Sequence, residues 1–173
     1  MIWSQGFKHR ALSNVKCAPI VDDVSTALKL RAKKVIMKTV FKIDVQFGDC
    51  DPAGIVFFPN FSKWMDAASL NFFVSHGVQP WRELVKTTGI IGTPLLEINT
   101  RFMKPATYGE TIEISTEITE WRPKVFIMQH IVTRDETLLC EGIEIRAFCV
   151  KDPVTDRIRA IEIPADIKAK CQA

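Results

Sequence analysis

Residues 47–60 read F-G-D-C-D-P-A-G-I-V-F-F-P-N and join an alternating apolar segment to an amphipathic one. This stretch predicts a strand, a sharp turn and a helix, because Gly54 permits turn conformations and the proline near its end fits a first helical turn. If strand geometry extends into the turn, Asp49 and Asp51 point to the same side. Unpaired N–H groups at the helix start would form a positive pole that can polarise a carbonyl group. Ordinary turn and cap chemistry accounts for the same residue types, so spacing alone does not establish a catalytic site.

The flanking segments predict one long helix and an antiparallel sheet. Apolar and polar residues alternate over residues 41–47, as in a half-buried strand. Residues 59–75 carry apolar side chains at helical spacing, which predicts one broad buried face. That face comprises Phe61, Trp64, Met65, Ala68 and Phe72. Further strands are predicted over residues 96–102, 112–118, 125–133, 143–149 and 158–163. The apolar set of the 143–149 segment is Ile143, Ile145, Ala147 and Cys149. Together these segments predict an α+β domain with the helix against the sheet.

Composition and charge limit the class of protein. The chain has 173 residues, of which 47% are hydrophobic and 25% charged, as expected for one globular domain. No apolar run approaches the roughly 20 residues that a membrane helix requires. Residues 1–34 carry seven Lys or Arg and two Asp or Glu, so the rest of the chain has an acidic excess despite the net charge of +3. We therefore expect neither a general affinity for nucleic acid nor a membrane partner.

The cysteines and histidines favour neither disulfides nor a metal. The five cysteines are scattered and include no C-x-x-C pair, which favours a reducing, cytoplasmic compartment. The three histidines lie far apart without ligand spacing, so no metal site is expected.

The first 34 residues differ in composition from the remainder. They contain no apolar core of the kind that a secretory signal has. We expect a poorly ordered N-terminal extension without a catalytic role, followed by a single domain over residues 35–173. Translation from Met37 is an alternative, because the family resemblance described next begins there.

From about residue 37 to its C-terminus the chain resembles the 4-hydroxybenzoyl-CoA thioesterase family. The resemblance rests on the opening stretch and on W-M-D-A-A-S (64–69), P-W-R (80–82), G-I-I-G-T-P (89–94), E-W-R (120–122) and R-I-R-A-I-E-I-P (157–164). It implies the hotdog fold, a curved antiparallel sheet wrapped around one long central helix. It also implies a homodimer that assembles into a homotetramer.

The same resemblance implies residue roles for hydrolysis of an acyl-CoA thioester. Asp51 would be the catalytic carboxylate, either as nucleophile or as the base that activates water. The backbone N–H of Phe58 would polarise the thioester carbonyl, although the family usually has a tyrosine at this position. Asp66 would accept a hydrogen bond from a phenolic 4-hydroxyl group, with Trp81 and Thr93 beside the ring. No cofactor is implied, because CoA is part of the substrate.

The resemblance also implies a basic site for the CoA phosphates. Its members would be Arg122, Lys124, Arg157 and Arg159. The family has a third basic residue where this chain has Pro123, so one phosphate contact is expected to be lost. Scattered basic residues more often lie on a solvated surface, and this reading stays open at the level of the sequence.

Three functions other than aromatic thioester hydrolysis remain compatible with parts of this pattern. The same reaction on short or branched aliphatic acyl-CoAs fits a pocket lined by phenylalanine. A non-catalytic acyl-CoA-binding module on the same fold would tolerate substitution of Asp51. A dehydratase of this fold is disfavoured, because such enzymes pair an aspartate with a histidine and no histidine lies near the turn.

Overall fold

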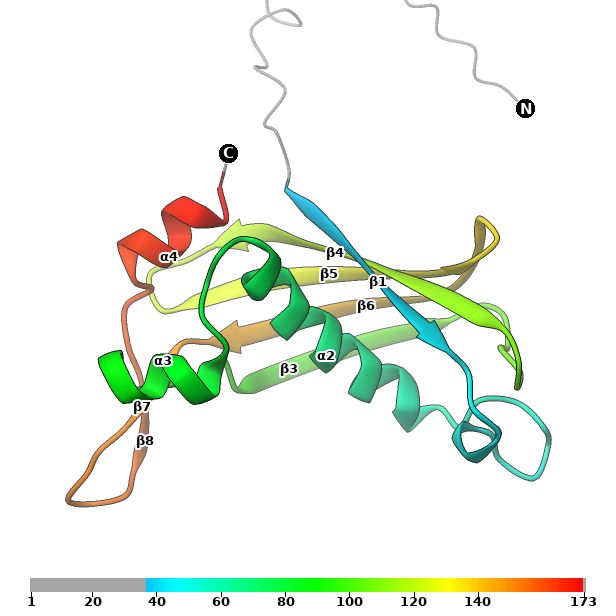
Figure 1. Ribbon diagram of the computed structural model, residues 1–173, viewed down its shortest axis with the longest axis horizontal. Helices are drawn as coiled ribbons and strands as arrows, with labels where there is room; N and C mark the ends of the chain where they lie inside the picture. The colour runs from blue at the N-terminus through cyan, green and yellow to red at the C-terminus, as the bar shows by residue number, and fades with distance from the viewer. Residues whose placement is uncertain (1–36, 173) are drawn as a thin grey trace, which may run out of the picture. The chain divides into compact units, whose positions relative to one another are not determined.

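A computed structural model describes residues 37–172 of the chain (Figure 1). The expected N-terminal extension over residues 1–34 therefore lies outside the described residues. In chain order the elements are β1 (Lys38–Asp44), the 3-10 helix η1 (Phe47–Asp49), α2 (Pro59–Ser75), α3 (Trp81–Thr88), β2 (Ile90–Gly92), β3 (Leu95–Phe102), β4 (Thr111–Trp121), β5 (Val125–Arg134), β6 (Thr137–Ala147), β7 (Cys149–Lys151), β8 (Ile158–Ala160) and α4 (Ala165–Lys170).

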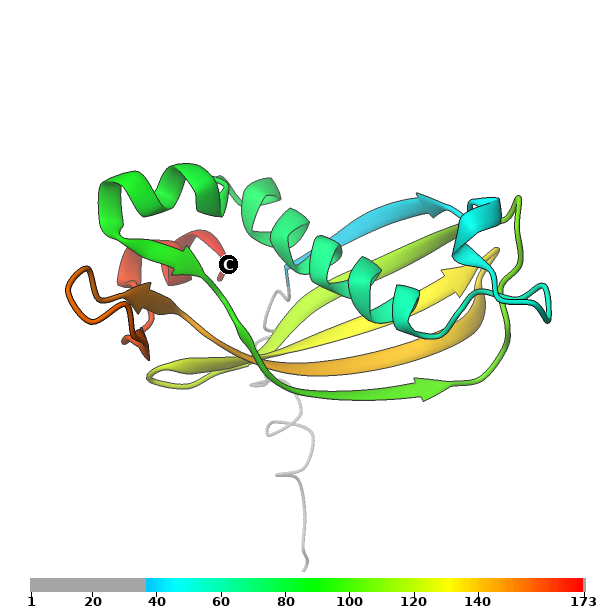
Figure 2. The same cartoon turned by 90° about the horizontal axis from the view of Figure 1, so that it is seen from below.

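The five long strands form one antiparallel sheet in the order β1-β4-β5-β6-β3. This sheet curves, and α2 lies along its concave face (Figure 2). The predicted α+β architecture with one long helix against an antiparallel sheet is thereby confirmed. A small second sheet, β2-β7-β8, was not predicted, because strands of three residues are too short to show a period.

The helix α2 forms the centre of the hydrophobic core. All five side chains predicted for its apolar face are buried. Its first half packs with Ile112, Ile114 and Leu139 of the sheet, and its second half packs with Phe126 and Phe148. This packing fixes the helix on the sheet and thereby fixes the position of its N-terminus and of its exposed residues.

Strand β6 buries polar side chains as well as apolar ones. Ile143 is 47% exposed, whereas Glu144 is fully buried and Arg146 is 4% exposed. Of the other members of the predicted apolar set, Ile145 is half-buried, and Ala147 and Cys149 are buried. The polar residues can face the core because they bond to one another and to α2.

Candidate active site

The turn between β1 and α2 is held by the carboxylate of Asp49. Strand β1 ends at Asp44 and a 3-10 helix follows, so the condition of strand geometry, under which Asp49 and Asp51 would point to the same side, is not met. Asp49 Oδ2 accepts the Gln46 N–H at 2.8 Å, and the Asp49 carbonyl accepts the Phe57 N–H at 2.8 Å. Asp49 is thus a structural residue of the turn.

The carboxylate of Asp51 is half-buried and has one oxygen available. Its Oδ1 accepts the Ala53 N–H at 2.8 Å, while within residues 37–172 no protein donor contacts Oδ2. Gly54 turns the loop with a φ of 77°, which a residue with a side chain rarely adopts. Asp51 lines a cavity of about 420 Å³ together with Cys50 and Tyr108. The carboxylate is therefore open to a ligand in this cavity.

The backbone N–H of Phe58 is unpaired at the entrance of α2. Phe57 and Asn60 donate their N–H groups to carbonyl oxygens at 2.8 and 2.9 Å, and Pro59 has none. No acceptor for the Phe58 N–H occurs in the described part of the chain. This donor lies at the positive end of the helix dipole, as required of a group that stabilises a developing oxyanion.

The side chain of Phe58 is 62% exposed and borders a separate apolar cavity of about 320 Å³. Phe61 and Phe102 form part of the same wall. The ring of Phe58 also packs edge-on against Phe57, with centroids 5.3 Å apart. No hydroxyl group replaces the tyrosine that the resemblance led us to expect, so this wall is apolar.

Asp66, Trp81 and Thr93 line one pocket of about 460 Å³. These are the three residues assigned to the acyl group from the sequence, and the structure brings them together. Trp81 begins α3 and packs on Gly92, where an added Cβ would lie 3.3 Å from the indole. Gly92 thus allows the indole to form one wall of the pocket.

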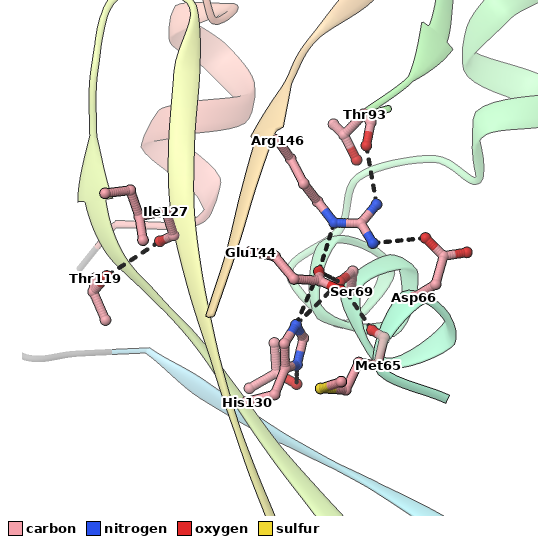
Figure 3. Close-up of polar contacts among 10 residues, drawn as sticks. Met65, Asp66, Ser69, Thr93, Thr119, Ile127, His130, Glu144 and Arg146 are labelled. Atoms are coloured by element: carbon pink, nitrogen blue, oxygen red, sulfur yellow. Dashed lines mark hydrogen bonds and ion pairs between the residues drawn. The ribbon is translucent and has the colours of Figure 1, made fainter. Parts of the chain in front are cut away.

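Arg146 is a fourth polar residue of this pocket, and the sequence reasoning missed it. Its Nη2 donates to Asp66 Oδ1 at 2.7 Å and its Nη1 donates to the Thr93 carbonyl at 3.0 Å (Figure 3). The available signal was that Glu144 and Arg146 are two apart on one strand and therefore share a face.

Behind Arg146 lies a buried polar cluster that joins α2 to the sheet. Glu144 Oε2 accepts hydrogen bonds from Arg146 Nε at 2.7 Å and from Ser69 Oγ at 3.1 Å, and lies 3.1 Å from His130 Nε2. Thr116 Oγ1 lies 2.9 Å from His130 Nδ1. Burial alone would raise the pKa of Glu144, but the hydrogen bonds of His130 and Arg146 and their charges outweigh it and lower this pKa to about 2.

The basic residues assigned to CoA lie in two places at one end of the molecule (Figure 1). Arg122 and Lys124 are exposed in the turn between β4 and β5, where Arg122 bonds Glu120 at 2.8 and 3.1 Å. Arg157 and Arg159 are exposed on the hairpin of β7 and β8. Of these four, only Arg122 lines the nearby cavity of about 460 Å³, which also contains Lys168. The structure thus leaves the four as two exposed pairs.

The half of the site around Asp51 and Phe58 is separated from the pocket around Asp66. Phe58 and Asp66 are eight residues apart on α2, which corresponds to about 12 Å along the helix axis. The cavity lined by Asp51 does not include Asp66, and the pocket lined by Asp66 includes neither Asp51 nor Phe58. The two groups of residues therefore border different pockets.

None of the helices within residues 37–172 has the length and apolar character to cross a bilayer. That part of the chain likewise contains no group of three His, Cys, Asp or Glu side chains that could hold a metal ion.

The chain is similar to known thioesterases in both sequence and structure. The sequence profile of the thioesterase-like superfamily matches residues 45–171. A 4-hydroxybenzoyl-CoA thioesterase of Pseudomonas sp. (strain CBS-3) is 46% identical over 132 residues, covering 73% of this chain and 92% of that protein. A solved structure of a 4-hydroxybenzoyl CoA thioesterase mutant with 4-hydroxybenzoyl CoA matches with a TM-score of 0.75 at 41% identity, over 78% of this chain and 99% of that one.

A second kind of relative shares the same fold. The structure of the gentisyl-coenzyme A thioesterase BH1999 matches with a TM-score of 0.68 at 32% identity, over 77% of this chain and 99% of that one. These structural matches confirm the hotdog fold that the sequence resemblance implied.

Proposed function

Because the chain belongs to the thioesterase-like superfamily, we propose that it hydrolyses an acyl-CoA thioester with a hydroxylated aromatic acyl group, such as 4-hydroxybenzoyl. The observation that carries this proposal is the pairing, in one short loop, of an open Asp51 oxygen with the unpaired N–H of Phe58. A thioester carbonyl needs both groups, a carboxylate at its carbon and a donor at its oxygen.

Asp51 acts on the thioester by one of two routes. Its oxygen can attack the carbonyl carbon, expel the CoA thiolate, which then takes a proton, and leave a mixed anhydride that water opens. Alternatively, it removes a proton from water, which attacks instead. In both routes negative charge develops on the carbonyl oxygen, where the Phe58 N–H stabilises it. The products are the free acid and CoA, and no cofactor takes part.

Asp66, Trp81 and Thr93 bind the acyl group in this proposal, with Asp66 accepting a hydrogen bond from the ring hydroxyl. Arg122, Lys124, Arg157 and Arg159 bind the CoA phosphates, because guanidinium groups pair well with phosphate oxygens. Pro123 removes one such contact, so CoA affinity is weaker while the reaction is unchanged.

We further propose that the two halves of the site come from two copies of the chain. The separation of about 12 Å along α2 supports this, because Asp51 and Asp66 line different pockets of one protomer. The free edge strand β3 exposes Leu96, Ile98 and Phe102, an apolar surface suited to a second copy. Homodimers would then assemble into homotetramers. The free Cys50, Cys140, Cys149 and Cys171 fit function in the reducing cytoplasm.

The first prediction concerns Asp51. Replacing it with Asn keeps the shape of the turn but removes the nucleophile or base, so kcat should fall at least about 100-fold. The measurement is thiol release from benzoyl-, 4-hydroxybenzoyl- and butyryl-CoA by the wild type and by Asp51→Asn. Asp156→Asn, on the exposed β7–β8 hairpin, is the control and should retain full activity. An Asp51→Asn enzyme with undiminished turnover would refute the mechanism.

The same substrate panel separates the competing functions. The apolar cavity beside Phe58 favours a second candidate, hydrolysis of short or branched aliphatic acyl-CoAs. That candidate predicts the highest kcat/KM with butyryl-CoA. A non-catalytic binding module predicts binding of all three thioesters without turnover, together with tolerance of Asp51→Asn.

A further inference from the structure

The pocket around Asp66 is connected to the interior of the protein by Arg146. The Arg146 side chain is 5% exposed, whereas the Asp66 side chain is 70% exposed (Figure 3). Arg146 therefore links a buried carboxylate, Glu144, to one that faces the pocket. Arginine suits this position because its planar fork donates along fixed directions and stays charged when buried.

The hydrogen bonds of Arg146 leave one Asp66 oxygen for a ligand. Arg146 directs Nε to Glu144, Nη1 to the Thr93 carbonyl and Nη2 to Asp66 Oδ1. Oδ2 of Asp66 has no partner among the described residues. A carboxylate anchored through one oxygen presents the other in a restricted direction, which suits recognition of a single donor.

Arg146 is in turn held in place by the cluster behind it. Glu144 Oε2 contacts Ser69, His130 and Arg146, so its own position is constrained from α2, β5 and β6. The Glu144 Oε1 atom is buried and has no partner within residues 37–172. The cluster thus directs Oε2 of Glu144 towards Arg146 and leaves Oε1 without a hydrogen bond. A buried oxygen without a partner lowers the stability of the protein. Positioning of the Arg146 guanidinium explains why this loss is tolerated.

We propose that Arg146 is a positioning residue that sets the acyl preference of the enzyme by anchoring Asp66, with Glu144 and His130 fixing Arg146 in turn. This inference rests on the function proposed above and specifies its substrate class. The Oδ2 atom of Asp66, which has no partner among the described residues, is a carboxylate oxygen and therefore only accepts hydrogen bonds. The pocket therefore favours a neutral ring substituent that donates a hydrogen bond, namely a hydroxyl or amino group, and disfavours a ring carboxylate.

The test is the substitution Arg146→Lys, which keeps the charge that balances Glu144 but cannot hold Glu144, Thr93 and Asp66 together. The measured quantity is the ratio of kcat/KM for 4-hydroxybenzoyl-CoA to that for benzoyl-CoA. We expect this ratio to fall about 10-fold, with benzoyl-CoA turnover retained. Arg134→Lys, at the half-buried pair with Glu110, is the matched control and should leave the ratio unchanged. Melting temperatures of both variants report on folding.

A double-substitution cycle shows whether Arg146 acts through Asp66. Asp66→Ala alone should lower the same ratio by about 10-fold or more. In the Asp66→Ala background, Arg146→Lys should have no further effect on it, because the two residues act as one unit. Additive effects, or an unchanged ratio in Arg146→Lys, would overturn the inference.

Failure of this inference can be told apart from failure of the proposed function. If the wild type hydrolyses none of the thioesters, the proposed function fails by itself. If it prefers the 4-hydroxybenzoyl thioester and Arg146→Lys keeps that preference, only the role of Arg146 is refuted. A 4-aminobenzoyl thioester should be accepted and a 4-carboxybenzoyl thioester rejected by the wild type, and the reverse order would contradict the hydrogen-bond argument.

Discussion

Glu144 is a buried carboxylate whose ionised form stabilises the folded state. Its pKa is lowered from the ordinary value of 4.5 to about 2, although burial by itself would raise it. Because the folded pKa lies below the unfolded one, this stabilisation is complete above about pH 4.5 and is lost as the pH falls towards 2. Its size is on the order of 3 kcal/mol.

We therefore predict that Glu144→Gln flattens the dependence of unfolding free energy on pH between 5 and 2. The substitution leaves Arg146 without its buried partner, so it should cost about 3–5 kcal/mol at pH 7. Urea denaturation across this pH range measures both effects. Glu113→Gln, which removes an exposed pair with Lys42, is the control and should change stability by less than about 1 kcal/mol. Parallel pH curves for Glu144→Gln and the wild type would contradict the assignment.

The residues of the site differ in how far they could be predicted from the sequence. The motif of residues 47–60 drew attention to Asp51 and to the N–H groups at the helix start, but their catalytic roles came from the family resemblance. Asp66, Trp81 and Thr93 could be assigned only through the family resemblance, and they do share a pocket. The partner of Asp66 could not be found, since Arg146 lies 80 positions away and joins it only when α2 packs on β6.

At the scale of elements, the contact of α2 with β6 depends on Gly142. A Cβ at this position would overlap the Met65 sulfur and approach the Met65 methyl group at 3.1 Å. Met65 is fully buried, so its side chain has little room to move away. The close approach of helix and strand is also what brings Glu144 within reach of Ser69.

We predict that Gly142→Ala destabilises the protein by about 1–3 kcal/mol through overpacking. The measurement is the free energy of unfolding in urea at pH 7. Gly48→Ala serves as the control, because nothing lies within 4 Å of an added Cβ there. The double substitution Gly142→Ala with Met65→Ala should be less destabilising than the sum of the single ones, since they share a contact. Strict additivity would show that Met65 is not the obstacle.

Elements were predicted well where a period runs over many residues. Helix α2 and the strands β3, β4 and β5 appear near their expected positions, whereas β1 and β6 both begin and end earlier in the chain than predicted. The last strand is shorter than predicted, because β8 ends at Ala160 and the chain then bonds to other segments. The burial of Glu144 and Arg146 on β6 could not be predicted, because periodicity gives alternation but not its direction, and partners distant in sequence decide which side is buried.

At the scale of the whole molecule, a site shared between two copies makes a prediction about mixed protomers. In a two-fold dimer of Asp51→Asn with Asp66→Ala, one of the two sites contains both original aspartates. After subunit exchange, the mixture should hydrolyse 4-hydroxybenzoyl-CoA faster than the average of the two separate variants.

The matched control replaces the Asp66→Ala protomer with the double variant Asp51→Asn/Asp66→Ala, which cannot form a complete site. That mixture should show no gain in rate. If subunits demonstrably exchange and the first mixture still runs at the average rate, then both aspartates of a working site belong to one protomer.

The architecture as a whole was the most predictable property, because a single central helix and antiparallel hairpins follow from local patterns. Assembly into dimers and tetramers was inferred only from the resemblance, because a single chain carries no pattern that specifies its partner.

The Arg146 cluster also bears on how this enzyme can change during evolution or engineering. Asp66, the proposed binding group for the far end of the acyl group, is joined through Arg146 to Glu144 in the protein interior. A new acyl preference therefore requires coordinated replacement of interior residues. The N–H of Phe58 at the start of α2, by contrast, belongs to the main chain. It is therefore retained with any side chain that is compatible with the turn. The main-chain donor is thus less sensitive to substitution than the acyl selectivity is, and we expect relatives to diverge in what they hydrolyse by several simultaneous substitutions.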